Sequence, residues 1–196
     1  MQHELILASG SPQRQELLKG LGIPFHVHVS RVEEGEVIER DPVKRSAMLA
    51  RFKAEDVEAM HPGAWVLGCD TLVVAADGDL LEKARDQAEA KRMIAKQSGN
   101  VSTVHSALCI LSPDRKVFAD VSSSSVHFKK LSPSEIDWWI GTGLWQGRSG
   151  SFQIDGSGQF MIERIHGDWS SIVGLPVFLL GELLKKAGWD LLSSAS

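Results

Sequence analysis

The sequence has few cysteines, no long apolar run and no long basic run, and each absence excludes a class of protein. Two cysteines in 196 residues, Cys69 and Cys109, do not suit a disulfide framework or a structural zinc site, so we expect buried free thiols. No apolar stretch approaches the length of a membrane span and the N-terminus lacks the pattern of a signal peptide. We therefore expect a cytoplasmic protein with no membrane partner. A formal net charge of −4 argues against a nucleic-acid partner, which needs a dense basic face.

Two common nucleotide-binding motifs are also missing. A P-loop needs a Gly-Lys pair, which the sequence does not contain. The nearest approach to a Rossmann fingerprint is GTGLWQG at 141–147, which has the wrong last spacing and follows a helix-like stretch rather than a strand. Any phosphate site in this chain must therefore be of another kind.

One such site is suggested near the N-terminus, in the stretch LILASGSPQRQELL at 5–18. An apolar, β-prone run ends at a loop of small residues, and leucines at helical spacing follow. Ser11 precedes Pro12, which places a capping residue before a proline at the first helical position. A helix N-terminus presents unpaired N–H groups to an anion, so the loop fits a phosphate seat. A strand, small-residue turn and capped helix also open many α/β proteins that bind no ligand there.

The rest of the chain reads as alternating strands and helices with no repeat and no low-complexity linker. We expect strands at 24–30, 65–69, 72–75, 101–111, 115–128 and 159–165, and helices at 42–60, 85–96 and 176–187. Another helix is expected to begin at Ser132, since Pro133 follows it and Glu135 completes a capping box. Residues 147–158 are rich in glycine and serine and predict a loop.

Asp70 is the residue that folding explains least. It is expected to end the strand that begins at Trp65, and a carboxylate inside an apolar run is unfavourable unless it is paired or used. Lys53 lies beside the apolar stripe of its helix and could point along the edge of the core. Asp70 could instead cap a turn or pair with an arginine, and Lys53 could be a surface lysine.

Several short motifs occur in an order and spacing that resemble one family over essentially the whole chain. They are ASGSPQRQELL, VEE, ARFKAE, GCDTLV, LEK, SGN, GSF and IVGLP. With these motifs the sequence resembles the Maf family of nucleoside triphosphate pyrophosphatases. The resemblance implies an inosine-triphosphatase-like α/β fold, with a mixed elongated sheet, flanking helices and two lobes around a cleft. It also implies a single domain over residues 1–196 and, as a further expectation, a homodimer.

The family further implies an activity and the residues that carry it. The activity is hydrolysis of a nucleoside triphosphate, surplus or non-canonical, to a monophosphate and pyrophosphate with a divalent metal, Mg²⁺ or Mn²⁺. The matching positions are Ser9, Gly10, Ser11 and Arg14 for the phosphate loop, Glu34 and Asp70 for the metal, Lys53 and Lys83 as cationic residues, and Asp70 as the catalytic base.

The chemistry of these residue types agrees with that assignment. A triphosphate brings three or four negative charges, which helix N–H groups, an arginine and two lysines can offset. Attack by water on the α-phosphorus needs a base, and carboxylate oxygens suit a hard metal that bridges phosphate oxygens.

Three positions leave the base preference open. Gln13 stands where one subgroup of the family has arginine and another often has tryptophan, Thr71 matches the thymidine and uridine subgroup, and Asp155 matches neither subgroup. A carboxylate would favour the positively charged 7-methylguanine, whereas Gln13 and Thr71 could serve pyrimidines. The sequence therefore predicts hydrolysis of 7-methyl-GTP, of UTP, dTTP and CTP, or of both groups. After the second of the two lysines, Lys83, this sequence has Ala84 where the family usually has a proline.

An alternative from another class is a regulator of cell division that binds nucleotides without hydrolysing them. Retention of both Asp70 and Glu34 favours the enzyme.

Overall fold

The structure, a computed structural model, describes residues 5–189. Its helices and strands occur in the order β1 (Leu5–Leu7), α1 (Pro12–Gly20), β2 (Phe25–Val27), the 3₁₀ helix η1 (Glu34–Glu36), α2 (Pro42–Met60), β3 (Trp65–Val74), α3 (Gln87–Gln97), β4 (Val101–Leu111), β5 (Val117–Phe128), α4 (Pro133–Gly141), the 3₁₀ helix η2 (Gly156–Met161), β6 (Ile162–His166), α5 (Trp169–Val173) and α6 (Val177–Lys186). The strands form one mixed sheet of six in the order β2-β1-β3-β4-β5-β6. The prediction of a mixed α/β sheet with flanking helices is confirmed.

Both directions of pairing occur in this sheet. β1 is parallel to β2 and to β3, whereas β5 and β6 are antiparallel with Ser125 opposite His166. Parallel neighbours need a crossover, and α1 and α2 supply the two crossovers of the N-terminal part. The predicted hairpin of long strands is β4 and β5, joined by a turn in which the N–H of Arg115 bonds to the carbonyl of Ser112 at 2.8 Å.

The chain divides into two compact units. Unit 1 comprises 1–70, 106–122 and 174–196, and unit 2 comprises 71–105 and 123–173. The expectation of one domain over residues 1–196 extends outside the described residues at both ends and stays a prediction. Among residues 5–189, no helix combines the length and the hydropathy needed to cross a bilayer.

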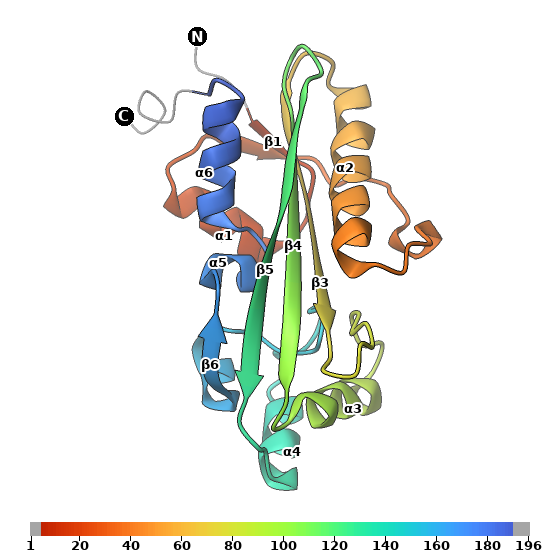
Figure 1. Ribbon diagram of the computed structural model, residues 1–196, viewed down its shortest axis with the longest axis vertical. Coiled ribbons are helices and arrows are strands. Elements are labelled where there is room, and N and C mark those ends of the chain that lie inside the picture. Colours follow the sequence, from red (N-terminus) through yellow and green to blue (C-terminus); the bar gives the residue numbers. More distant parts are fainter. Residues whose placement is uncertain (1–4, 190–196) are drawn as a thin grey trace. The chain divides into compact units, whose positions relative to one another are not determined.

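In unit 1 the strands have an apolar face on each side, because side chains alternate along a strand. Leu5, Leu7 and Cys69 pack with α1 and α6, whereas Ile6 and Cys109 pack with α2. Figure 1 shows α2 on one side of these strands and α6 on the other. Because helices cover both faces of the sheet here, the side chains on both sides of a strand are buried. All three residues of β1 are accordingly apolar and buried.

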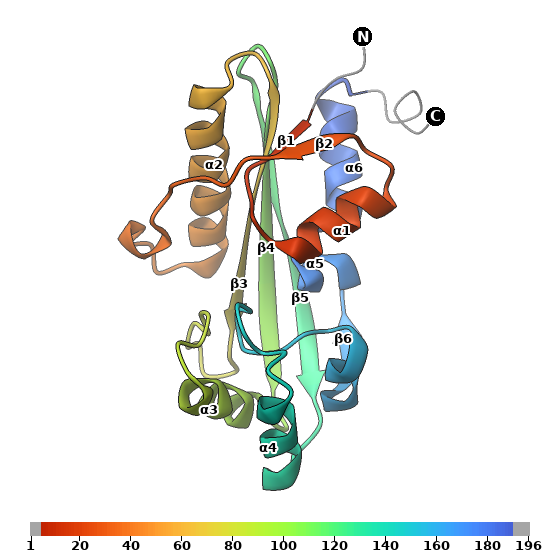
Figure 2. The same ribbon diagram turned by 180° about the vertical axis from the view of Figure 1, so that it is seen from behind.

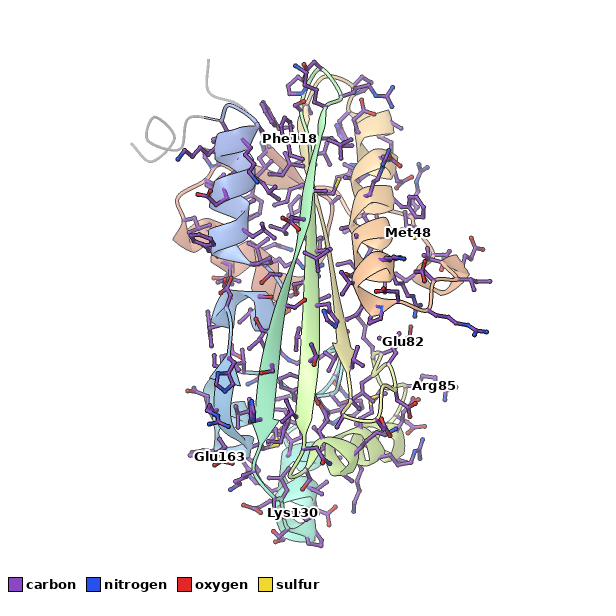
Figure 3. The ribbon with its side chains drawn as sticks, in the orientation of Figure 1. Met48, Glu82, Arg85, Phe118, Lys130 and Glu163 are labelled. Atoms are coloured by element: carbon purple, nitrogen blue, oxygen red, sulfur yellow. The ribbon has the colours of Figure 1, made fainter. Side chains whose placement is uncertain are left out.

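Unit 2 has its own core, in which α3 and α4 are the main helices. Ile94 and Trp139 are fully buried there together with Val104 and Val126 from the strands. Figure 2 shows α3 and α4 side by side, and Figure 3 adds the side chains, with Glu163 marking β6. The capping box predicted at the start of α4 is present, since Ser132 and Glu135 each bond to the other's main chain.

One local expectation was wrong. Asp70 does not end a strand, because β3 continues through it to Val74 and joins the two strands expected at 65–69 and 72–75. In α4, Trp139 is fully buried whereas Trp138 has 43% of its surface exposed. Neighbouring residues on a helix point about 100° apart, so two adjacent tryptophans do not both face the core.

Candidate functional site

The loop between β1 and α1 has the predicted capped form. Ser11 is the N-cap of α1, its Oγ accepts a hydrogen bond from the Arg14 N–H at 3.5 Å, and proline occupies the first turn. The Ser11 N–H in turn bonds to Oγ of Ser9 at 3.3 Å. A β-carbon added at Gly10 would lie 3.2 Å from the side chain of Val29, so the loop packs closely against Val29. Ser9, Gly10 and Ser11 thus lead directly into a helix N-terminus, where N–H groups can bind an anion.

Arg14 fixes this loop to a second part of unit 1. Its Nη1 donates to Oγ of Ser9 at 2.8 Å and its Nε donates to the carbonyl oxygen of Gly174 at 2.8 Å. Gly174 has a φ of 120°, a conformation that favours glycine, and it stands in the IVGLP motif before α6. Gln13, on the same turn, accepts a hydrogen bond from Oγ of Ser11 at 3.0 Å.

Lys53 joins two carboxylates. Its Nζ lies 2.6 Å from Oδ1 of Asp70 and 2.6 Å from Oε1 of Glu34. Lys53 and Asp70 are buried, with 7% and 3% of their surfaces exposed, whereas about half of the Glu34 side chain, 46%, is exposed. Lys53 is therefore no surface lysine, and Asp70 pairs with a lysine rather than with an arginine or a turn.

The two carboxylate oxygens of Asp70 differ, since only Oδ1 is paired with Lys53. Its Oδ2 is buried and has no hydrogen-bond partner among the described residues. Burial raises the pKa of Asp70 above its ordinary value, and the charges of Lys53 and Arg14 oppose that rise. Arg14, Lys53, Glu34 and Asp70 all belong to unit 1. A carboxylate with one oxygen fixed and the other without a partner can take up a proton or a cation.

Close packing between α2 and β3 makes this contact possible. A β-carbon at Gly68 would lie 2.0 Å from the carbonyl oxygen of Ala50 and 2.9 Å from the β-carbon of Ala54. Only glycine lets the strand approach the helix so closely. Asp70 lies two residues further along the same face of β3, and Lys53 lies on the side of α2 that meets it.

The remaining predicted residues belong to unit 2. Lys83 is exposed and its main chain pairs with Ser149, whose Oγ donates to the carbonyl oxygen of half-buried Thr71 at 3.4 Å. Lys83 lies between β3 and α3 in the chain, and Figure 3 labels Glu82 and Arg85 of the same connection. The structure thus links Lys83 and Thr71 through Ser149.

Asp155 is exposed and directly precedes η2, and its main-chain carbonyl accepts a hydrogen bond from the Gln153 amide at 3.0 Å. Arg148 is close enough for the carboxylate of Asp155 to raise the pKa of the guanidinium, although burial has the larger effect and lowers it.

Sequence reasoning missed the contributions of Gly174 and Arg148. The IVGLP motif was the available signal for Gly174, whereas nothing in the sequence around Arg148 distinguishes it from an ordinary loop arginine.

Within residues 5–189, no three or more His, Cys, Asp or Glu side chains are grouped so as to hold a metal ion. Glu34 and Asp70, which were predicted as metal ligands, are the two carboxylates that Lys53 joins. Their metal binding stays a prediction.

The chain is similar to known proteins over most of its length. A family model described as Maf-like protein matches residues 4–187. A dTTP/UTP pyrophosphatase of Deinococcus radiodurans is 41% identical, over 94% of this chain and 93% of the relative. Proteins with the same name from Treponema denticola and Thermus thermophilus are 39% and 40% identical, over 96% and 94% of this chain and 99% and 95% of theirs.

Solved structures give a more distant likeness. A nucleoside-triphosphatase / dITP/XTP pyrophosphatase from Mycobacterium abscessus superimposes with a TM-score of 0.43 at 14% identity, over 65% of this chain and 75% of that one.

Proposed function

We propose, because this chain belongs to the Maf family, that it hydrolyses pyrimidine nucleoside triphosphates, dTTP and UTP foremost, to a monophosphate and pyrophosphate. The observation that carries this proposal is the buried Lys53, whose ammonium joins Asp70 and Glu34 at 2.6 Å each. Buried ionisable groups are unfavourable unless they are paired, and they concentrate at functional sites. The names of the relatives supply the reaction.

The phosphate chain would bind at the β1–α1 loop. The N–H groups at the start of α1 and the guanidinium of Arg14 offer hydrogen bonds and positive charge to phosphate oxygens. We assign Lys53 to neutralising the negative charge that grows on the phosphate oxygens as the α-phosphorus is attacked, and Lys83 stays a predicted cationic residue of unit 2. Positive charge placed in advance stabilises such a transition state most where water is excluded.

Asp70 is the proposed general base. Its unpartnered Oδ2 would accept a proton from water as the water oxygen bonds to the α-phosphorus. The bond between that phosphorus and the bridging oxygen breaks, and pyrophosphate leaves with the bonding electrons. A pKa raised by burial makes Asp70 a better proton acceptor than an exposed aspartate.

A divalent cation fits the carboxylate pair. Mg²⁺ is commonly bound through one or two carboxylates together with substrate phosphates, and Lys53 brings the carboxylates of Asp70 and Glu34 together. Asp70 and Glu34 would hold Mg²⁺ or Mn²⁺. The ion would supply positive charge to the triphosphate oxygens.

The base preference is proposed on two grounds. The relatives are named for dTTP and UTP. The charge of Asp155 is also partly offset by Arg148, which weakens its attraction for the cationic 7-methylguanine. Oε1 of Gln13 is engaged by Ser11, which leaves the amide NH₂ to meet a carbonyl oxygen of uracil or thymine.

The test is pyrophosphate release from dTTP, UTP, CTP and 7-methyl-GTP with Mg²⁺ or Mn²⁺. We expect the highest kcat/KM for dTTP and UTP, and we expect Asp155→Asn to change the ratio of kcat/KM for 7-methyl-GTP to kcat/KM for UTP.

Asp70→Asn should abolish turnover and preserve binding, since the amide keeps the shape but cannot accept the proton. Binding without turnover by the unaltered protein would favour the regulator of cell division, and an unchanged ratio would show that Asp155 does not contact the base.

A further inference from the structure

Glu34 lies on a segment that has no regular structure of its own. Residues 28–33, between β2 and η1, form neither helix nor strand, and Glu34 opens the three-residue η1. Such a segment has no hydrogen-bonded ladder to fix it, so its position depends on contacts with neighbouring elements. The helix α2 supplies several of those contacts.

Asp56 of α2 makes two of them. Its Oδ2 accepts the main-chain N–H of Arg31 at 2.8 Å, and its Oδ1 accepts a hydrogen bond from Nη2 of the same arginine at 2.8 Å. These hydrogen bonds from Arg31 lower the pKa of Asp56. Because the Arg31 side chain is 71% exposed, its ion pair alone contributes little. The bond to the main chain is the one that fixes the segment.

Another contact holds the start of the segment against the end of α2. Nδ1 of His28 lies 2.8 Å from Nε2 of His61, which caps the end of α2. Nη2 of Arg45, also on α2, reaches the carbonyl oxygen of Glu34 at 3.4 Å. The path of the main chain from His28 to Glu34 is therefore set by the same helix that carries Lys53.

The spacing along α2 gives Asp56 its significance. Lys53 and Asp56 are three residues apart and lie on one side of the helix, one turn from each other. Lys53 binds the Glu34 carboxylate, and Asp56 binds the main chain three residues before Glu34. We propose that Asp56 is a positioning residue that holds the segment so that the half-exposed Glu34 carboxylate meets Lys53 and Asp70.

The adjacent residue offers a matched control. Glu55 is also half-buried on α2, and it pairs with Arg51 one turn earlier on the same helix at 2.7 Å. Among the described residues, no hydrogen bond or ion pair joins Glu55 or Arg51 to the segment at 28–34. Replacing Glu55 removes a comparable charge and a comparable ion pair, and it should leave Glu34 in place.

The first experiment measures catalysis and rests on the proposed function. Asp56→Ala should lower kcat for UTP about tenfold, should change KM less than about twofold, and should raise the Mn²⁺ concentration for half-maximal activity. Asp56→Asn, which keeps an oxygen for the Arg31 N–H, should recover most of the loss, and Glu55→Ala should match the unaltered protein. In a Glu34→Gln background Asp56→Ala should have little further effect. An equal loss in both backgrounds would overturn the proposal.

The second experiment needs no turnover. Amide hydrogen exchange should be faster at residues 31–36 in Asp56→Ala than in the unaltered protein, and unchanged in Glu55→Ala, with α3 as an internal reference. Unchanged exchange at 31–36 would overturn the proposal. Absence of pyrophosphate release from every nucleotide would instead contradict the proposed function, and the exchange result would still decide whether Asp56 holds the segment.

Discussion

The ammonium group of Lys53 is nearly buried, and its ion pairs with two carboxylates compensate for the lost hydration. Asp70 shares its burial, and the half-exposed Glu34 contacts Lys53. Removing one partner of a buried ion pair usually destabilises a protein by several kcal/mol, because the remaining charge has no compensation. The three side chains therefore behave as one unit.

Lys53→Met should show this dependence. The substitution keeps much of the apolar stem and removes the charge, so we expect kcat/KM to fall by a factor corresponding to about 2–4 kcal/mol of transition-state stabilisation. The pKa of Asp70 should rise further, since Lys53 lowers it. Pyrophosphate release measures the loss, with Lys44→Met, an exposed lysine on the same helix, as the control. Equal kinetics in the two variants would exclude Lys53 from catalysis.

At the residue scale, the sequence indicated that Asp70 needs a partner, because a carboxylate in an apolar run is unfavourable when unpaired, and the structure shows Asp70 buried and paired with Lys53. The role of Asp70 in catalysis stays a prediction. The partner of Asp70, 17 positions away, could not be read from spacing, so the strand appeared to end where it continues. Asp56 gave no signal at all, since its role depends on the path of an irregular segment.

The pairing of α2 with β3 is the main feature at the scale of elements. Both ends of α2 were predicted correctly, because Pro42 can open a helix and an alanine stripe marks its buried side. The close approach at Gly68 could not be predicted, since a glycine inside a strand has several explanations.

Gly68→Ala tests this approach. The new methyl group would overlap the carbonyl of Ala50, so the helix and strand must separate. We expect a loss of about 1–3 kcal/mol in the free energy of unfolding and reduced activity, because Lys53 would no longer reach Asp70 as closely. Urea unfolding measures the first effect. Gly181→Ala in α6, where an added β-carbon meets nothing within 4 Å, should be neutral or stabilising. A similar result for both substitutions would contradict this account.

The cap of α4 gives a pH-dependent prediction. Hydrogen bonds from Lys129 and Ser132 lower the pKa of Glu135 from 4.5 to about 2. A lowered carboxyl pKa stabilises the fold above the unfolded value, and this stabilisation is lost as the pH falls toward 2. Glu135→Gln should therefore destabilise the protein slightly near neutral pH. In urea titrations the difference should shrink as the pH falls from about 5 to about 2, and a constant difference would exclude the charge as its cause.

The whole molecule has separate cores in its two units but shares three strands between them. β3, β4 and β5 each have residues in both units. Because a strand cannot lose its pairing in one half without loosening the other, we expect the units to unfold together.

Ile94→Ala tests this coupling. Ile94 is fully buried in the core of unit 2, and its truncation should remove about 2–5 kcal/mol of stability. The urea midpoint should fall equally by far-ultraviolet circular dichroism and by labelling of Cys69 and Cys109, which lie in unit 1. Phe178→Ala, at a side chain with 78% exposure, should shift neither. A thiol transition that stays in place while the other moves would show that the units unfold independently.

The two thiols also define how the protein responds to oxidants. Cys69 and Cys109 lie on the neighbouring strands β3 and β4 but on opposite faces of the sheet, one with α6 and the other with α2. Burial raises the pKa of Cys69 to about 11 and that of Cys109 to about 12, so neither forms a thiolate readily. A disulfide needs both sulfur atoms on one side of the sheet. The folded chain therefore lacks an internal redox switch between its cysteines, and its fold should be the same in oxidising and reducing surroundings.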